Sequence, residues 1–357
     1  MKTVWVRGLA VLLAAASLST LGSGCAGEDD AQVIGRNMAP IRDGFVDEQG
    51  LFPHVFALVA EVPTVNSEGD PAVSFSLCSG TLIAPNLLLT AQHCVAELEE
   101  EFILCLGESF GDMFPTNRMV ATNVPAISGS IAQSQVFGVS RVLIPEESRE
   151  ICGYDIALVE LSRNVPDTVA RPIAPRLDVP PAAQEPYTAV GYGDTGDGEG
   201  MEGTRRYRGE LSIRCFGPDC PSVLRLTDTE IEGDRGTCSG DSGGPMLDED
   251  GLVLGALSRG AIGCSTSTWA AVYPWADWIR GHAADAADNG GYEPAAWVRP
   301  AGGDGCIGDG CDEVGLGGGD LFDCSTAPAT ATLPIGALAL ILLLVTARRR
   351  TCYNVAP

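Results

Sequence analysis

Short apolar runs separated by turn residues dominate the middle of the chain. The runs at residues 82–83 and 87–89 are typical, and glycine (44) and proline (23) are plentiful among the 357 residues. Long patterns with the 3.6-residue period of a helix are rare. This alternation of short runs and turns favours an all-β chain.

One helix is expected at the end of this β-rich body, at residues 273–286. Its apolar residues Trp275, Trp278 and Ile279 recur at spacings of three and four. Such spacing places them on one helix face, which would pack against the body.

The N-terminus has the composition of a bacterial-type secretory signal. Basic residues up to Arg7 precede an apolar run from Leu9 to Leu21, and small residues lead to Cys25. We expect the signal to span residues 1–25. Two interpretations stay open here: a lipoprotein signal that leaves lipid on Cys25, or an ordinary signal peptidase cut nearby.

The C-terminal part of the chain has a different composition from the body. Residues 289–324 are Gly-rich and acidic, which indicates a linker. Residues 325–347 carry no charge and precede three arginines. This pattern predicts a transmembrane segment, or a sorting segment that is later cleaved, with residues 348–357 as a basic cytoplasmic tail.

Charge and cysteine content narrow the function. A formal charge of -25 speaks against a nucleic-acid binder, because little here could replace the counterions on a phosphate backbone. Thirteen cysteines with no CxxC pair, and only three histidines, indicate disulfides formed in an oxidising compartment. No segment has convincing metal-ligand spacing, and neither a metal nor a cofactor is expected.

Two motifs carry candidate chemistry. Of the three histidines, only His93 lies in a chemically meaningful pattern, TAQHC at residues 90–94, where an apolar strand runs into a turn. Ser242 lies in GDSGGP at residues 240–245, where glycines let backbone N–H groups approach a substrate carbonyl. A serine hydroxyl is a poor nucleophile until an imidazole takes its proton, so the two motifs together indicate acyl transfer.

Both motifs resemble the signatures of trypsin-like serine proteases, over residues 41–288. The resemblance implies an all-β fold of two six-stranded Greek-key β-barrels, with the active site between them and a C-terminal helix. It also implies an aspartate between the histidine and the serine, at the entry to a strand. Asp155, which precedes the apolar run at residues 156–159, matches that position.

The resemblance implies a role for each residue. Ser242 attacks the scissile carbonyl, His93 takes its proton and passes it to the leaving amine, and Asp155 orients His93. The backbone N–H groups of Gly240 and Ser242 would form the oxyanion hole.

The resemblance also implies disulfide partners. It pairs Cys78 with Cys94, and Cys238 with Cys264. The remaining cysteines of the body allow two local pairs, Cys105 with Cys152 and Cys215 with Cys220. No pairing follows for Cys306, Cys311 and Cys324 of the C-terminal region.

In the family, the residue six positions before the nucleophile forms the floor of the primary specificity pocket, which here is Gly236. The implied walls are Ser258, Gly260 and Ala271. A pocket without an acid predicts cleavage after small or medium apolar residues, because a buried unpaired cation is costly. Arg259 stands where the family usually has an aromatic residue, and a solvent-facing side chain is its simplest interpretation.

Family zymogens mature by a cut that frees an Ile or Val ammonium, which then binds the aspartate just before the nucleophile. Asp241 is that aspartate, and Ile41 best matches the new terminus, which makes residues 26–40 a short propeptide. Pro40 precedes Ile41, so a tryptic cut is not expected. Another protease could make the cut, the enzyme could be active without it, or the terminus could lie elsewhere, with Arg36 the nearest upstream basic residue.

The expected function is therefore that of a serine endopeptidase acting on proteins or peptides through an acyl-enzyme. The alternative is a catalytically inactive surface binding module on the same fold. The expected location is exported, in the periplasm or at the cell surface, either anchored in the membrane or released after processing of the tail.

Overall fold

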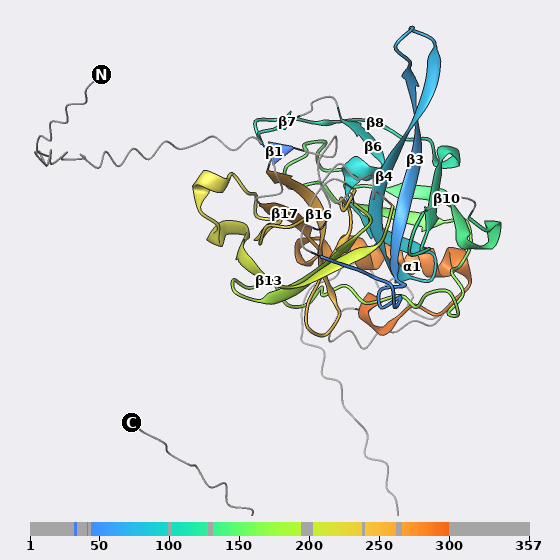
Figure 1. Cartoon of the computed structure of the whole chain (residues 1–357). Helices are drawn as coiled ribbons and strands as arrows, with labels where there is room; N and C mark the ends of the chain where they lie inside the picture. Colours follow the sequence, from blue (N-terminus) through green and yellow to red (C-terminus); the bar gives the residue numbers. More distant parts are fainter. Residues whose placement is uncertain are drawn as a thin grey trace, which may run out of the picture. The chain divides into compact units, whose positions relative to one another are not determined.

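The computed structural model describes residues 32–33, 41, 44–98, 102–127, 131–193, 203–237, 240–261 and 266–299 (Figure 1). All of them belong to one compact unit, Met1–Gly305. The predicted signal, the linker beyond residue 299, the 325–347 segment and the basic tail lie outside the described residues, as do Cys238 and Cys264.

A first barrel is closed by six antiparallel strands in the order β10-β11-β5-β4-β3-β9. Their bounds are β3 (Val55–Val65), β4 (Pro71–Ala84), β5 (Leu87–Thr90), β9 (Met119–Thr122), β10 (Val136–Leu143) and β11 (Ala157–Leu161). β9 returns to pair with β3 after the consecutive strands β3, β4 and β5, which is Greek-key connectivity. Phe56, Leu88 and Phe137 are among the residues that fill its interior.

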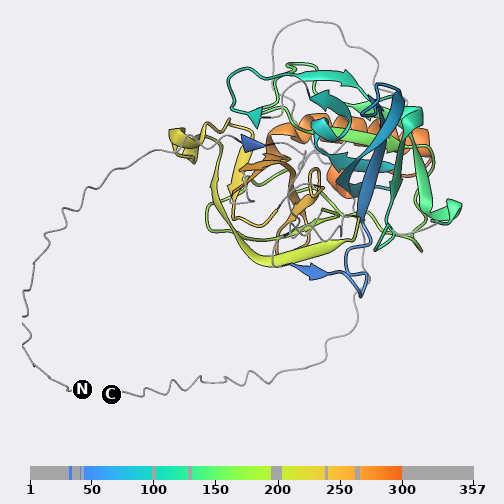
Figure 2. The same cartoon turned by 45° about the horizontal axis from the view of Figure 1, so that its top comes forward.

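A second barrel consists of β12 (Pro186–Gly191), β13 (Arg206–Phe216), β14 (Glu230–Gly233), β15 (Pro245–Leu247), β16 (Val253–Ala261) and β17 (Ser267–Ala271). β15 pairs with both β12 and β16, which closes the ring. Its core includes Ile213, Met246 and Trp269. In Figure 2 the two barrels lie beside each other, with the long blue β3 and β4 in one and the yellow-green β13 in the other.

Short elements join and border the barrels. The remaining strands are β1 (Gln32–Val33), β2 (Phe45–Val46), β6 (Ala96–Leu98), β7 (Phe102–Ile103) and β8 (Phe110–Met113). The 3-10 turns are η1 (Gln92–Cys94), η2 (Thr116–Arg118), η3 (Gln133–Gln135), η4 (Gly217–Asp219), η5 (Ser222–Leu224), η6 (Tyr273–Trp275) and η7 (Ala296–Val298). β1 lies between β16 and β7 and pairs with both.

The helix α1 (Ala276–Gly290) follows η6 and ends at Gly291, whose positive φ of 66° gives a left-handed C-cap. Ile279 is fully buried and Trp275 nearly so, in a cluster that joins the helix to residues of both barrels. The prediction of two six-stranded barrels and a C-terminal helix is therefore confirmed. The helix runs four residues beyond the predicted end at residue 286.

Within the described ranges, no helix is both long enough and apolar enough to cross a membrane.

Candidate active site

His93 and Asp155 meet at one end of a strand pair in the first barrel. β5 and β11 pair with Ala157 opposite Thr90. His93 lies just past the end of β5, in η1, and Asp155 lies just before β11, so the two side chains reach the same edge. His93 Nδ1 lies 2.8 Å from Asp155 Oδ2, and the backbone N–H of His93 donates to Asp155 Oδ1 at 2.9 Å.

A third donor completes the surroundings of Asp155. The hydroxyl of Ser258, in β16 of the second barrel, donates to Asp155 Oδ2 at 2.6 Å. Burial by itself would raise the pKa of Asp155, but the neighbouring His93 ring and these hydrogen bonds outweigh it and hold the pKa below its ordinary value. Asp155 is thus a buried carboxylate placed to accept a hydrogen bond from Nδ1–H of the imidazole, which turns Nε2 away from it.

Ser242 lies in the turn that leads into β15, at a point where the chain has no room for larger residues. Gly243 has a φ of 76°, and a Cβ there would overlap Thr90 Oγ1 and the carbonyl oxygen of Ser79. This explains the second glycine of the GDSGGP motif. Ser242, His93 and Gly240 line one groove of about 410 Å³, so the structure brings these three predicted residues together.

Ser79, in β4, links the first barrel to the Ser242 turn. Its hydroxyl donates to the carbonyl oxygen of Gly240 at 2.9 Å and accepts the backbone N–H of Tyr192 at 2.9 Å. Its own N–H donates to the carbonyl oxygen of Ser242 at 2.7 Å. The sequence analysis did not identify Ser79, because a serine one position after Cys78 carries no recognisable motif.

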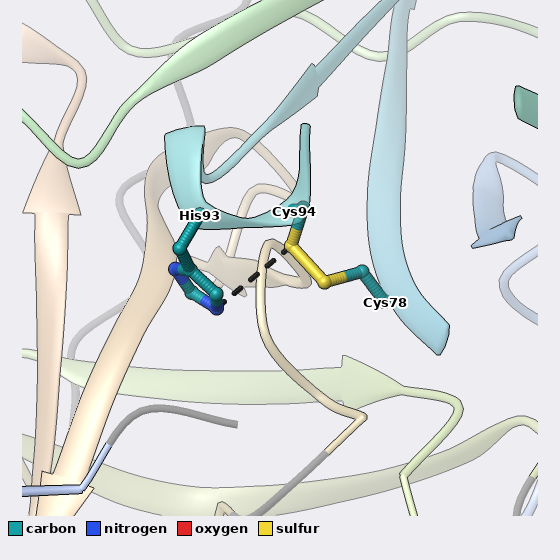
Figure 3. Close-up of side chains that lie close together, drawn as sticks. All are labelled: Cys78, His93 and Cys94. Carbon is teal, nitrogen blue, oxygen red and sulfur yellow. Dashed lines mark hydrogen bonds between the residues drawn. A yellow bond between two sulfur atoms is a disulfide. The ribbon is translucent and has the colours of Figure 1, made fainter. Parts of the chain in front are cut away.

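Cys78 and Cys94 form a disulfide next to His93, and Figure 3 shows their sulfurs beside the imidazole. Cys94 Sγ lies 3.9 Å from His93 Nε2. Two cysteines and a histidine this close could suggest a metal site. Sulfurs that share a bond are not thiolates, however, and thiolates are the form that binds metals. The disulfide instead fixes the short turn that carries His93.

The other disulfides fall in the regions expected for them. Cys105 bonds to Cys152, just before Asp155, and Cys215 bonds to Cys220 at the end of β13. The predicted pairing of Cys238 with Cys264 lies outside the described residues.

Three of the four predicted pocket residues lie together, and the fourth does not. Ser258 and Gly260 lie two positions apart in β16. Gly236 precedes Thr237, whose hydroxyl lies 2.5 Å from that of Ser267, the first residue of β17. Gly260 approaches the start of β17 as well, because a Cβ there would lie 2.7 Å from the carbonyl oxygen of Thr266.

The assignment of Ala271 to the pocket wall was wrong. Ala271 is fully buried in the core of the second barrel, opposite Gly255, four residues and roughly 13 Å along β17 from Ser267. Residues four apart in a strand point to the same face. The sequence pattern therefore could not distinguish Ala271 from Ser267.

Arg259 is not the solvent-facing side chain that the sequence suggested. Its side chain is fully buried and forms a two-point ion pair with Glu230 of β14, with Nη1 to Oε1 at 2.5 Å and Nη2 to Oε2 at 3.1 Å. Burial disfavours the charge, but Glu230 outweighs it and the pKa of Arg259 lies above its ordinary value. A charged pair of this geometry is strongly oriented.

The ion pair extends to Asp155 by two routes. In the first, Arg259 Nη1 donates a hydrogen bond to Ser258 Oγ at 3.3 Å, and the Ser258 hydroxyl donates its own hydrogen to Asp155. Glu230 Oε1 also accepts the backbone N–H of Gly153 at 3.0 Å, two residues before Asp155. Sequence reasoning missed Glu230, because no motif surrounds it.

The two predicted activation residues are both buried. Ile41 packs in the core of the second barrel, and its carbonyl oxygen accepts the N–H of Gly44 at 3.1 Å. Asp241 Oδ1 accepts the N–H of Gly193 at 2.9 Å.

The sequence that forms this geometry matches a known protein family. A model of the trypsin family, described as Trypsin, matches residues 60–279, which is more than half of the chain and includes His93, Asp155 and Ser242. The chain belongs to the trypsin family of serine-type endopeptidases. In the family, Arg259 replaces an aromatic residue, so the buried Arg259–Glu230 pair is a departure from the usual pattern.

Relatives of this chain within the trypsin family come from several organisms. Serine protease Hayan of Drosophila melanogaster is 27% identical over 275 residues, which cover 68% of this chain but 38% of Hayan. Trypsin of Simulium vittatum is 26% identical over 55% of this chain and 75% of its own length. Trypsin of Saccharopolyspora erythraea is 27% identical over 55% of this chain and 80% of its own length. The chain thus spans less than two fifths of Hayan and at least three quarters of the two trypsins.

The structure of human heparin binding protein aligns with this chain at a TM-score of 0.50 and 18% identity. The alignment covers 71% of this chain and 100% of that protein. At this identity the likeness supports the fold only.

Proposed function

We propose that this trypsin-family chain hydrolyses peptide bonds through an acyl-enzyme, with Ser242 as nucleophile, His93 as general base and Asp155 as the residue that orients His93. One observation carries the proposal. Asp155 is buried, accepts three hydrogen bonds and faces Nδ1 of His93 at 2.8 Å, and His93 in turn lines a groove together with Ser242. An exported binding protein would have no need for a buried carboxylate that fixes the tautomer of a histidine.

The mechanism follows from these contacts. Ser242 Oγ adds to the scissile carbonyl carbon while its proton moves to His93 Nε2. The N–H groups of Gly240 and Ser242 stabilise the oxyanion, at about 3 kcal/mol for each donor. The proton then passes from Nε2 to the leaving amine as the C–N bond breaks. Water repeats the sequence on the acyl-enzyme, and Ser242 is regenerated.

The proposed preference is for small or medium apolar residues on the acyl side of the scissile bond. Gly236, at the proposed pocket floor, offers no carboxylate. Arg208 Nη1 lies so close that a Cβ on Gly236 would overlap it. A lysine or arginine side chain would meet no carboxylate at this floor, so its burial would cost the desolvation of an unpaired charge.

Activation is proposed to follow a cut before Ile41 by another protease. The new ammonium of Ile41 would then pair with Asp241, which already holds the N–H of Gly193. Residues 32–33 of the proposed propeptide form β1, in which Val33 pairs with Gly260. Removal of residues 26–40 would therefore also clear the backbone of β16, where the acyl side of a substrate is expected.

The proposed setting is outside the cytoplasm. A signal at residues 1–25, the three disulfides and the 325–347 segment together support an exported protease that is held at the membrane or released from it. Proteins and peptides are the proposed substrates. Mass spectrometry of both mature termini would test the signal, any lipid on Cys25, the cut before Ile41 and the fate of the tail.

The proposed activity is tested by fluorophosphonate labelling of the mature protein, followed by a peptide-library digest. We expect one label on Ser242 that is lost in Ser242→Ala, and cleavage after small or medium apolar residues. Correctly processed protein that takes no label would instead favour the inactive binding module. Cleavage of simple esters with no cleavage of peptides would indicate a different serine hydrolase.

A further inference from the structure

The buried pair of Arg259 and Glu230 lies two hydrogen bonds from Asp155. Its side chains are 0% and 1% exposed. Arg259 stands where the trypsin family usually has an aromatic residue, so the pair is not part of the triad that the family shares. A buried ion pair costs desolvation and is weak evidence for stability by itself. Its contacts with the catalytic groups therefore point to what it does.

Arg259 fixes the direction of the Ser258 hydroxyl. A guanidinium group only donates hydrogen bonds, and Arg259 Nη1 donates to Ser258 Oγ at 3.3 Å. The single hydrogen of that hydroxyl must then go to another acceptor. Asp155 Oδ2 lies 2.6 Å from Ser258 Oγ, and an ionised carboxylate only accepts. The hydrogen is thus directed to Asp155 from both sides.

Glu230 holds the backbone just before Asp155. Its Oε1 accepts the N–H of Gly153 at 3.0 Å, and its Oε2 accepts the N–H of Thr227 at 2.9 Å. The hydroxyl of Thr229, next to Glu230 in the chain, donates to the carbonyl oxygen of Gly153 at 2.6 Å. Both backbone groups of Gly153 are therefore fixed by the segment that carries Glu230.

The charge of Arg259 acts on Asp155, and Glu230 balances it. Burial would lower the pKa of Arg259, but Glu230 outweighs this effect, and Asp155 and Glu232 add to it, so the pKa of Arg259 is raised. Asp155 is the carboxylate that stabilises the imidazolium of His93 during the reaction. A cation at Arg259 without a counter-charge would oppose that imidazolium.

Glu232, two residues after Glu230 in β14, is a second carboxylate that acts on Arg259. Burial raises the pKa of Glu232 to about 7, against the hydroxyl of Thr268, which donates to Oε2 at 3.2 Å, and against the charges of Arg214 and Arg259. Glu232 therefore titrates near neutral pH, and its titration has to be separated from that of His93.

We propose that Arg259 and Glu230 are positioning residues for hydrolysis, which act on the reaction through Asp155. Arg259 fixes the Ser258 hydroxyl on Asp155. Glu230 holds Arg259 in place and offsets its charge, so that His93 keeps its strength as a base. This inference rests on the function proposed above.

The first test is the pH dependence of kcat/KM for Glu230→Gln with a peptide substrate. The acid limb of this profile reports protonation of the essential base in the free enzyme. Glutamine leaves Arg259 charged, because a guanidinium does not lose its proton in a protein. The unbalanced cation opposes protonation of His93, so the acid limb should move to lower pH by about half a pH unit, less than a charge in direct contact would cause.

The second test adds Arg259→Leu to Glu230→Gln, which removes the cation as well. The acid limb should return to within about 0.2 pH unit of that of the parent. The Ser258 hydroxyl has then lost its charged partner, so kcat should stay about tenfold lower, with KM changed less than twofold. Arg259→Lys keeps the charge with a poorer fit, and should lower kcat about threefold without moving the acid limb. Loss of packing alone would not move the limb and then restore it.

The matched control is a second arginine–glutamate pair between neighbouring strands. Arg141 Nε of β10 donates to Glu160 Oε2 of β11 at 3.0 Å. Glu160 lies five residues after Asp155, roughly 17 Å along an extended chain. Glu160→Gln should therefore leave kcat and the acid limb unchanged. The whole series is repeated with Glu232→Gln in every protein, where the same movements should appear without the titration of Glu232.

Other outcomes overturn the proposal. A folded Glu230→Gln with unchanged kcat and an unchanged acid limb would exclude both roles. A limb that moves and is not restored by Arg259→Leu would mean that the charge of Arg259 is not its cause. If the Glu230 variants do not fold, as judged by near-UV circular dichroism, Arg259→Lys decides alone, because a kcat equal to that of the parent would exclude positioning. A parent that takes no fluorophosphonate label would overturn the proposed function itself, whereas a labelled parent with unaffected variants overturns only this inference.

Discussion

The surroundings of Asp155 and the outer half of the β3–β4 hairpin are built in opposite ways. Asp155 is buried, accepts three hydrogen bonds, and is backed by the buried Arg259–Glu230 pair. The outer half of the hairpin, which we call the ribbon, exposes Val65, Val73 and Phe75, and its strands are held by backbone pairing to each other. Charge is thus buried where one geometry must be kept, and apolar area is left exposed on the ribbon.

The difference indicates what each region controls. A buried ionic network resists rearrangement, because any movement leaves a charge or a donor without its partner. A protruding two-stranded ribbon adds little to the core and can change in sequence without loss of the fold. We therefore expect changes near Asp155 to alter rate and stability together, and changes on the ribbon to leave stability nearly unchanged.

The largest effect is expected for Asp155→Asn. The amide would offer a donor where His93 Nδ1–H needs an acceptor, so the imidazole would hold the wrong tautomer and kcat should fall by roughly 10⁴-fold. Steady-state kinetics on a peptide substrate would measure it. Asp167→Asn is the matched control, since Asp167 is an exposed partner of Arg171 and should leave kcat unchanged. A loss of less than tenfold for Asp155→Asn would remove Asp155 from the proposed triad.

The second prediction concerns the stability of the buried pair. Arg259→Leu leaves the Glu230 carboxylate buried without its cation and should lower the free energy of unfolding by about 4 kcal/mol. Arg259→Leu with Glu230→Gln should recover about 2 kcal/mol, because a neutral amide oxygen still serves the N–H of Gly153. Urea unfolding would measure both.

The control for this pair is an exposed ion pair on the same chain. Arg171→Leu removes a contact to Asp167 in which both side chains are more than 70% exposed, at 81% and 73%. Its effect should stay within about 0.5 kcal/mol. A double variant no more stable than Arg259→Leu would show that Glu230 is not held in place by Arg259.

Short motifs in the sequence were sufficient to predict the family and, through it, the fold class. The residues around His93 and Ser242 are constrained by close backbone approach, as at Gly243, so they leave a recognisable pattern. Glu230 and Ser79 act through hydrogen bonds, and Glu230 also through an ion pair, to residues far away in the chain. Nothing in their local sequence distinguishes them from any other buried polar residue. Only the barrel pairing brings them to the site.

Two interpretations failed for different physical reasons. Ala271 was placed in the pocket because residues 271–273 resemble a strand of the family, and so short a match does not fix the position of a residue along the strand. Arg259 was taken as exposed because arginine is rarely buried unless it is paired, and its partner Glu230 was invisible in the sequence. The ribbon was not foreseen either, since its polar and apolar residues carry no burial pattern.

A third prediction extends the contrast to pH. His54 precedes β3, and burial, with a smaller effect from Arg205 that Asp47 partly offsets, lowers its pKa from 6.5 to about 4. The unfolded chain therefore binds a proton between pH 6.5 and 4 that the folded chain does not, and stability falls as the pH falls through this window. The loss from His54 should approach about 3 kcal/mol by pH 4.

Urea unfolding of the parent and of His54→Gln at pH 7 and pH 4 would isolate this effect. Glutamine does not titrate, so the variant should lose less stability than the parent on acidification. His282→Gln is the control. It removes a different histidine, on α1, whose Nδ1 lies 3.7 Å from a carboxylate oxygen of Asp285. If the parent and His54→Gln lose equal free energy of unfolding between pH 7 and pH 4, groups other than His54 cause the loss of stability in acid.

The smallest effect should come from the ribbon, where Phe75→Ser and Val73→Thr are expected to change the free energy of unfolding by no more than about 0.5 kcal/mol. Both side chains are more than half exposed, so their removal opens no cavity and leaves no buried group without a partner. Urea unfolding would measure this beside Arg259→Leu. A loss of 2 kcal/mol or more would mean that the ribbon packs against a part of this chain outside the described residues. The ribbon would then contribute to the stability of the fold, as the Asp155 network does.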